Sequence, residues 1–279
     1  MIGYFYHNLE QIHLSILQHI HRSWSHGRRL VTICHTIMWL SIPFLAIGQN
    51  EKGNEYGVLN VNITYGAHLP GADWAERYGF HFSVGGGLEY ITYPGNFIFG
   101  VESSYIFGGT VHENVLEPLQ NEEGEIIGND LQFADVNLRQ RGLYTGFYVG
   151  KLFNIIPKNE RAGIRVTLGG GYLWHRIRIQ DDFDTAPQFF GEYSKGYDRL
   201  TDGLGLTQFI GYQSLAKDRR ANFMIGLEFM QAFTSSVREF NWDTRAFTAG
   251  ERRLDLRFGI RAAWTIPFYI SQPPETIFY

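Results

Sequence analysis

The residue types that most often do chemistry are scarce and poorly spaced in this sequence. The body of the chain after residue 48 contains no cysteine. Its four histidines are His68, His81, His112 and His175. None of them forms an HxxH or HExxH pattern, the spacings that place two zinc ligands on one helical face. Ser103 or Ser104 with His81 would be the nearest approach to a nucleophile and base, and their spacing fixes no geometry. We therefore predict no catalytic residue, no metal site and no cofactor.

Two glycine triplets and one acidic run also invite a binding interpretation. Gly85, Gly86 and Gly87 are not followed by Gly-Lys-Ser/Thr or by a helical pattern, and the same holds for the triplet at residues 169–171. Glycines inside strands more often mark curvature or make room for a large neighbour. The acidic run at residues 181–184 could offer oxygens to calcium, but it lacks the Gly and Glu of an EF-hand loop. We interpret it as a solvated acidic loop.

Seven charged residues fall on the small-residue side of segments in which large apolar and small residues alternate. They are Glu89, Glu102, Arg165, Glu228, Asp255, Arg257 and Arg261. If the segments are strands of a barrel, all seven face the lumen. Two interpretations are open, an ion or substrate path and a plug of salt bridges. The plug is favoured, because an isolated buried charge is very costly and eight strands leave little room for a pore.

The elements that would position these charges are eight segments with period-2 alternation. The predicted strands are 56–68, 79–91, 97–108, 140–153, 162–177, 200–212, 221–234 and 253–268. Each is longer than the ~5–6 residues usual for soluble strands and reaches the ~9–11 residues that a tilted transmembrane strand needs. The alternation is weakest in the fourth and sixth segments, whose register the sequence does not fix.

The orientation of the two faces decides the class of protein. In the last segment the large face is Leu254, Leu256, Phe258, Ile260, Ala262, Trp264, Ile266 and Phe268. A narrow lumen cannot hold a large side chain at every inward position, so this face must point outward, into lipid. Aromatics gather near the predicted strand ends, as in interfacial girdles; these are Tyr65, Tyr90, Phe97, Phe107, Tyr212 and Phe268.

The connections alternate in length, which supports the same class. Residues 92–96, 154–161 and 213–220 are short connections with turn chemistry, whereas 109–139, 178–199 and 235–252 are long. Short periplasmic turns and long surface loops are typical of outer-membrane barrels. We therefore predict an all-β fold, a closed antiparallel transmembrane β-barrel of about eight strands.

The long loops contain aromatic residues among charges, as recognition loops do. The candidates for contact with a partner are Trp74, Phe189, Phe190, Tyr193 and Trp242, and Tyr197, Phe240 and Phe247 belong to the same group. The alternative is that these side chains pack loop against loop above the barrel. The sequence favours neither.

The two ends of the chain differ from its body. Residues 1–48 are predicted to be a signal peptide with a long n-region, because Arg28 and Arg29 precede an apolar stretch that ends in Ala46-Ile47-Gly48. A retained helical anchor is the alternative. Residues 49–268 then form the barrel and 269–279 a periplasmic tail. The net charge of −4 and the lack of a Lys/Arg cluster argue against nucleic acid as a partner.

Residues 49–279 resemble the small eight-stranded outer-membrane barrel families, the OmpA-transmembrane/OmpX-like group and, more narrowly, the PorT-like barrels of Bacteroidota. Those families end in a strand with a polar residue, Gly and aromatics. Arg257, Gly259 and Trp264 fit that pattern, while Ala262 stands where an aromatic is expected. The resemblance implies an accessory role in protein secretion or surface assembly. The tail is too short to imply a peptidoglycan-binding domain.

Together these observations predict a non-enzymatic integral outer-membrane barrel, whose partners are membrane lipid and another envelope component. Three alternatives remain open: a small channel, a surface enzyme on the same fold, and a soluble β-domain on a helical anchor.

Overall fold

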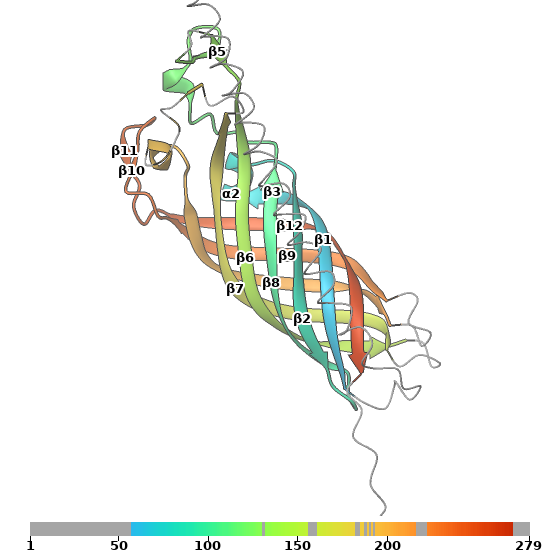
Figure 1. The fold of residues 1–279 in the computed structure, drawn as a ribbon. Helices are drawn as coiled ribbons and strands as arrows, with labels where there is room; N and C mark the ends of the chain where they lie inside the picture. Colours follow the sequence, from blue (N-terminus) through green and yellow to red (C-terminus); the bar gives the residue numbers. More distant parts are fainter. Residues whose placement is uncertain are drawn as a thin grey trace, which may run out of the picture. The chain divides into compact units, whose positions relative to one another are not determined.

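A computed structural model describes residues 57–129, 132–155, 161–181, 185–186, 189, 191, 193–215 and 222–269. Most of this part forms eight long antiparallel strands (Figure 1). They are β1 (Val58–Ala72), β2 (His81–Ile91), β3 (Phe97–Gly108), β6 (Val136–Asn154), β7 (Ala162–Asp181), β8 (Thr201–Ser214), β9 (Phe223–Ser236) and β12 (Arg252–Tyr269). The short elements are α2 (Asp73–Arg77), β4 (Ile126–Ile127), β5 (Phe133–Ala134), β10 (Phe240–Asn241), β11 (Ala246–Phe247) and the 3-10 turns Glu117–Leu119 and Tyr193–Gly196.

The strands close into a barrel in the order β1-β12-β9-β8-β7-β6-β3-β2. The closing pair is β1 with β12, whose register runs from Val58 opposite Tyr269 to Ala72 opposite Asp255. Every other pair joins two barrel strands that are consecutive in the sequence. Closure removes both sheet edges, so that the backbone N–H and C=O groups of the strands pair without water, as a bilayer requires.

The predicted fold class is confirmed, because each of the eight predicted segments is one of the eight barrel strands. The third was predicted to its ends, Phe97–Gly108. The largest differences lie in β1, β6 and β7. β1 ends at Ala72 rather than at residue 68, and β6 and β7 pair from Val136 opposite Asp181, beyond their predicted ends. The β4–β5 hairpin precedes β6 in the chain and lies beyond the upper ends of β6 and β7 (Figure 1).

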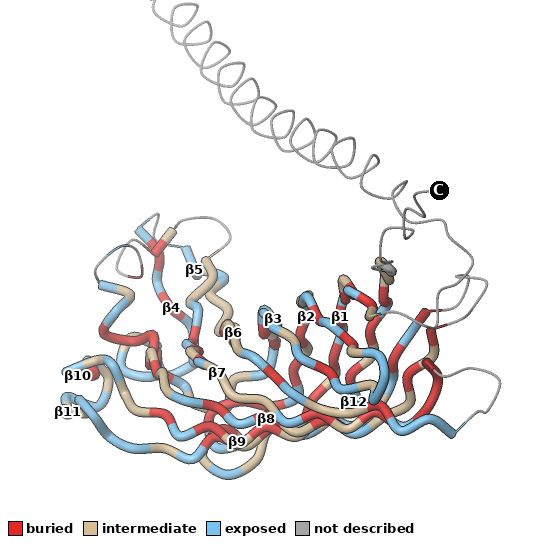
Figure 2. Tube along the Cα trace, turned by 90° about the horizontal axis from the view of Figure 1, so that it is seen from below, coloured by how far each residue is buried: buried red, intermediate tan, exposed pale blue. Residues whose placement is uncertain are grey.

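The outer face of the barrel is apolar, which makes it a transmembrane barrel. Exposed and buried positions alternate along the strands (Figure 2). Many exposed strand positions are held by large apolar side chains, among them Leu88, Phe99, Phe147, Leu168, Leu204, Ile210, Leu227 and Ile260. Leu204 keeps 69% of its surface exposed. A water-facing surface of this composition would be unfavourable, whereas lipid tails accept it.

The two strands with weak alternation, β6 and β8, have large aromatic side chains facing inward. Tyr144 and Tyr148 of β6 and Phe209 of β8 are buried. Glycines on neighbouring strands make room for them: a Cβ on Gly100 would lie 2.4 Å from the Tyr148 ring, and one on Gly226 would lie 2.8 Å from Phe209. Inward aromatics therefore hide the alternation that sequence analysis relies on.

The barrel has two unlike ends. The short-turn end comprises residues 92–96 and the connections after Asn154 and Ser214, and the first and last strands begin and end there. The long-loop end comprises four loops. The first contains α2, and the second, third and fourth follow Gly108, Asp181 and Ser236. The predicted signal peptide at 1–48 and residues 270–279 of the predicted tail lie outside the described residues. No helix in the described part is long and apolar enough to cross a membrane.

Because the outer face contacts lipid, we expect a cationic side chain placed on it to destabilise the barrel, most strongly at mid-bilayer. Ile260 lies near the middle of β12 with 55% of its surface exposed. We expect Ile260→Arg to lower the free energy of unfolding by about 2–4 kcal/mol, because a guanidinium at mid-bilayer is poorly solvated. Urea unfolding in phospholipid vesicles measures this, with Ile260→Leu as the control. An equal stability of the Arg and Leu variants would contradict a lipid-facing position.

Candidate functional site

The lumen is filled at three levels, and the first lies near the short-turn end. Here Arg165 donates to both oxygens of Glu89, at 3.0 Å from Nη1 and 2.6 Å from Nη2. Asn60 Nδ2 and the Tyr148 hydroxyl each donate to Glu89 at 2.8 Å. Arg165 also donates to Gln213 Oε1 at 2.7 Å. Both charged side chains are buried, and each makes hydrogen bonds in addition to those of the ion pair. We call this group the short-turn layer.

An apolar cluster closes the lumen below that layer. Its buried members are Val58, Ile91, Ile98, Tyr148, Leu152 and Leu215. Because these side chains come from β1, β2, β3, β6 and the residue after β8, they meet from several sides of the barrel. An ion approaching from the short-turn end would have to displace this cluster before reaching the first charge.

The middle layer centres on Glu228 of β9. Arg257 Nη2 lies 2.6 Å from Glu228 Oε1, and Arg261 Nη1 lies 2.7 Å from Glu228 Oε2. Arg261 also pairs with Glu102 Oε2 at 2.9 Å, and its guanidinium lies 4.7 Å from the centre of the Phe209 ring. Two arginines and two glutamates balance one another. The charges therefore form a neutral cluster, as the plug interpretation requires.

The third level, the long-loop layer, combines one carboxylate with a column of stacked rings. Thr234 donates to Asp255 Oδ2 at 2.5 Å, and His175 Nε2 lies 2.9 Å from the same oxygen. The Trp74 ring lies between those of His81 and His175, at 5.2 and 5.0 Å between centres and within 15° of parallel. His81 stacks in turn on His68 at 5.7 Å. Trp74 is completely buried.

The structure places all seven predicted lumen charges on the inner face, but it divides them among the three layers rather than joining them in one network. Glu89 and Arg165 form the first pair, and Asp255 belongs to the third level. Glu102, Glu228, Arg257 and Arg261 make the middle layer.

The ring column was not predicted from the sequence, because the histidines were considered only as zinc ligands or as a catalytic base. The useful signal was register: His68 and His81 lie directly opposite each other on β1 and β2, on the inner face. In the described part of the chain, no group of three or more His, Cys, Asp or Glu side chains could hold a metal ion.

Above the long-loop layer, the residues that follow β1 fold back over the mouth of the barrel. The chain turns at Ala72, whose φ of 50° is in the left-handed region, and α2 follows. Arg253 donates to the Asp73 carbonyl at 2.8 Å, and the Leu254 N–H donates to Asp73 Oδ2 at 2.7 Å. These bonds fix the start of α2 on β12, and its Trp74 side chain points down into the ring column.

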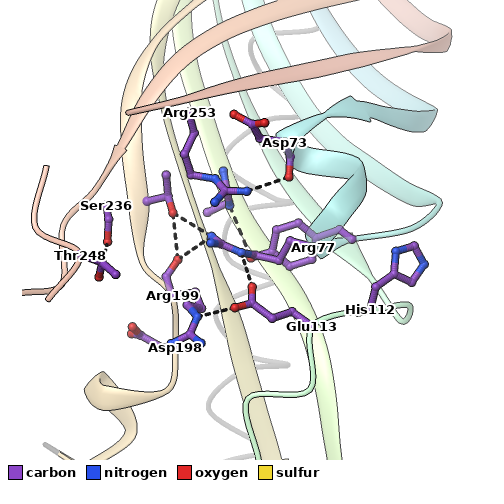
Figure 3. Close-up of polar contacts among 12 residues, drawn as sticks. Asp73, Arg77, His112, Glu113, Asp198, Arg199, Ser236, Thr248 and Arg253 are labelled. Atoms are coloured by element: carbon purple, nitrogen blue, oxygen red, sulfur yellow. Dashed lines mark hydrogen bonds and ion pairs between the residues drawn. The ribbon is translucent and has the colours of Figure 1, made fainter. Parts of the chain in front are cut away.

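Ion pairs connect α2 with the other three loops, and Figure 3 shows those of Glu113 with Arg77 and Arg199. Glu113 of the second loop accepts from Arg77 at 2.7 Å and from Arg199 of the third loop at 2.6 Å. Arg199 also binds Asp243 of the fourth loop through two bonds, of 2.9 and 2.5 Å. Arg77 donates to Thr201 Oγ1 at 3.0 Å. We call these four residues, Arg77, Glu113, Arg199 and Asp243, the cap network.

The cap network sets the charge state of Glu113. Partial burial alone would raise the pKa of its carboxyl, but the guanidinium groups of Arg77 and Arg199 outweigh burial and lower this pKa. Burial also opposes the charge of Arg199, and its hydrogen bonds to Asp243 and Glu113 raise its pKa. Glu113 and Arg199 therefore stay ionised at neutral pH, and the hydrogen bonds between them are charge-assisted.

The predicted loop contact residues divide into two groups. The prediction that Trp74 contacts a partner at the surface was wrong, because α2 turns this side chain into the lumen. Phe189 is also buried, and it packs edge-on against Tyr197 at 6.1 Å. Tyr193 and Trp242 remain exposed, by 59% and 42%. Phe190 lies outside the described residues. Packing inside the structure therefore accounts for Trp74 and Phe189, and for Tyr193 and Trp242 contact with a partner stays a prediction.

The nucleophile and base considered from sequence do not meet. Ser103 is exposed on the outer face and lies 2.9 Å from Thr145 Oγ1, while His81 is buried in the lumen. Ser104 lies on the inner face, opposite Gly85, four strand positions from His81. At the usual rise per residue this is about 13 Å. Neither serine can therefore hydrogen-bond to His81 in this structure.

Comparison with known proteins identifies no family. No family model matches the chain, and no curated protein does. Among solved structures it is similar to Ail, the attachment invasion locus protein of Yersinia pestis solved with the heparin analogue sucrose octasulfate, with 13% identity over 76% of this chain and 99% of that one and a TM-score of 0.33.

Two barrels of Pseudomonas aeruginosa are also similar. The N-terminal β-barrel domain of OprF is 10% identical over 74% of this chain and 97% of its own, with a TM-score of 0.31. OprG is 10% identical over 78% and 99%, with a TM-score of 0.29. Superpositions this weak support no argument, and the fold described above rests on the strand pairing of this chain.

The short-turn layer predicts strong coupling between its two charges. We expect Glu89→Gln and Arg165→Met each to cost about 3–5 kcal/mol of unfolding free energy, because each leaves a buried charge without its partner. The double variant should cost less than the sum of the two. Denaturant unfolding in vesicles measures this cycle. Glu89→Gln combined with Asp255→Asn, which belongs to a different layer, should be additive. Additivity within the Glu89–Arg165 pair would contradict the layer.

The cap network predicts acid-dependent opening of α2. Because the pKa of Glu113 is lowered on folding, its stabilisation is complete above the ordinary Glu value of about 4.3 and is lost as pH falls through the lower, folded value. Hydrogen exchange of the α2 amides, corrected for intrinsic rates, should therefore speed up below that value. Glu113→Gln should show the fast exchange already at neutral pH.

The matched control for the cap is Glu117→Gln, a change to an exposed glutamate of the same loop, which should leave exchange in α2 unchanged. Protection of α2 that is insensitive both to acid and to Glu113→Gln would contradict a role of the cap network in holding it.

Proposed function

We propose that this protein is a non-conducting, non-enzymatic outer-membrane barrel that works through its long-loop end, as a contact surface for another component of the cell envelope. The observation that supports this most directly is the lumen. Three layers of paired side chains and an apolar cluster fill it, and α2 covers its mouth. A barrel closed in this way offers its loops, not its interior, to other molecules.

The barrel itself supports an outer-membrane location. Closed antiparallel barrels with an apolar outer band, short turns at one end and long loops at the other are typical of bacterial outer-membrane proteins. In that class the short turns face the periplasm and the long loops face the outside. The long-loop end, with α2 and the cap network, is then the extracellular surface. The predicted signal peptide fits export through the inner membrane.

The buried ion pairs argue against a channel. An ion crossing the barrel would have to break the Glu89–Arg165 pair and the Glu228 cluster, and removing one partner of a buried pair is strongly unfavourable. An eight-stranded barrel has an interior just wide enough for its own side chains. The charged side chains are therefore part of the packing of the lumen. They fill it and satisfy one another without water.

The loops offer what a contact surface needs. The cap network holds α2 and three loops in one arrangement, which lowers the entropic cost of binding. Exposed aromatic side chains project from this end: Phe133, Tyr193, Trp242 and Phe247. Aromatic residues are enriched at binding hot spots. The finer form of the proposal is an accessory role in secretion or surface assembly, and it rests on the resemblance to PorT-like barrels.

Planar bilayer recordings test the closed lumen. We expect the purified protein to show no steady ionic conductance, and we expect Arg257→Gln and Glu102→Gln to leave the current at baseline or to produce only irregular leaks. A stable ohmic conductance of the unaltered protein, with an ion selectivity that changes when Arg257 or Glu102 is neutralised, would contradict the proposal and identify a small channel.

A further inference from the structure

A hollow of about 350 Å³ lies on the long-loop end between the third and fourth loops. Its lining residues are Tyr193, Lys195, Gly196, Arg238, Glu239, Phe240 and Trp242. Its size is at the lower end of the roughly 300–1,000 Å³ typical of small-ligand sites. The hollow is separate from the lumen and from the cap network, and the proposed function above assigns it no ligand.

Two aromatic rings form one side of the hollow. The Trp242 and Tyr193 rings meet edge to face, with centres 5.7 Å apart and planes at 73°. Tyr197 supports Trp242 from another side in a similar contact at 5.8 Å. Trp242 is 42% exposed and Tyr193 is 59% exposed. Part of each ring therefore remains open to a ligand while the rest is held by neighbours.

The chain holds Trp242 in place with little freedom. The backbone N–H of Trp242 donates to the Gly196 carbonyl at 3.0 Å. The indole ring lies so close to Gly196 that a Cβ there would be 2.5 Å from Trp242 Cδ2. The next residue, Asp243, is bound by both terminal nitrogens of Arg199. On the facing side, Arg238 makes two bonds of 2.8 and 2.6 Å to Asp198. The hollow is thus formed before any ligand binds.

The mixture of groups narrows the class of ligand. The exposed part of the Trp242 indole lies beside charged and hydrogen-bonding side chains. This mixture suits a molecule with one apolar face and a rim of hydroxyls, which is the chemistry of a sugar ring. An anion is less well matched, because the Arg238 guanidinium is already engaged by Asp198 and Glu239 adds negative charge. A protein partner would cover a wide, flatter area rather than one small hollow.

We propose that this hollow binds a neutral hexose unit of a surface glycan, with the sugar ring lying against Trp242 and its hydroxyls hydrogen-bonded by Glu239 and Lys195. The inference deepens the proposed function, since it requires the long-loop end to face outward in the cell. Trp242 supplies most of the contact area, and Gly196 permits its position.

The test uses the full-length protein in detergent micelles and a panel of fluorescently labelled neutral oligosaccharides: maltopentaose, cellopentaose, mannopentaose and galactopentaose. We expect at least one to bind, and Trp242→Ala to weaken that binding about tenfold or more, as loss of a hot-spot aromatic does. Gly196→Ala should weaken it too, by displacing the indole. Phe133→Ala removes an exposed aromatic outside the hollow and should leave binding unchanged.

Three results would overturn the inference. They are the absence of binding to every member of the panel, equal binding by Trp242→Ala and the unaltered protein, and loss of binding in the Phe133→Ala control. Capture of a labelled casein peptide pool in place of the sugars, lost in Trp242→Ala, would also overturn it and assign the hollow to peptides. Heat-dependent gel mobility of each variant shows that its barrel has folded.

A second arm separates failure of the hollow from failure of the proposed function. The chain has one cysteine, Cys34, in the predicted signal peptide. A cysteine introduced as Phe247→Cys should react with a membrane-impermeant maleimide on intact cells, and Tyr93→Cys on the short-turn end should not. The reverse pattern would contradict the proposed orientation, while the micelle measurement would still decide sugar binding.

Discussion

The rest of the structure depends on the cost of leaving a polar group unpaired inside a barrel that is surrounded by lipid. Strands that place large apolar residues outward must place small or polar residues inward, and eight strands enclose too little space for water to solvate many charges. Each charge on the inner face therefore needs a partner within the barrel. Glu89 finds three donors and Glu228 finds two guanidinium groups, and both carboxylates are buried.

The same constraint explains why the barrel is closed at its long-loop end. Asp255 needs donors there, and Thr234 and His175 provide them. The rings of His81 and His175 then present flat faces, and Trp74 fills the space between them. Placing Trp74 there requires α2 to fold back, and the cap network holds it. The packing of the lumen thus helps to set the arrangement of the loops. This includes Trp242, whose neighbour Asp243 belongs to the cap network.

Much of the fold could be predicted from the sequence, because period-2 alternation reports directly on a barrel with one apolar face. The segment of β3 was predicted to its ends, and the inner positions of Asp255, Arg257 and Arg261 on β12 follow from Leu254, Leu256 and Phe258 on the outer face. The pattern is weak where Tyr144, Tyr148 and Phe209 face inward. There an aromatic side chain no longer indicates lipid.

The candidate site could be predicted only in part, since alternation gives the face of a residue but not its partner. Which arginine pairs with Glu228 depends on strand stagger, and both Arg257 and Arg261 reach it from the neighbouring strand β12. Trp74 follows a strand end, so no periodicity shows that it turns inward. The cap network joins residues as far apart as Arg77 and Asp243, and loop sequences hold no signal of such contacts.

Gel mobility shows whether the protein is a closed, folded barrel in the outer membrane. Protein from the outer-membrane fraction should migrate faster unboiled than boiled, since a closed barrel resists detergent and stays compact. N-terminal sequencing of the band should begin at Gln49. An unshifted band in the inner-membrane fraction, still including residues 30–48, would contradict the account and favour a β-domain on a helical anchor.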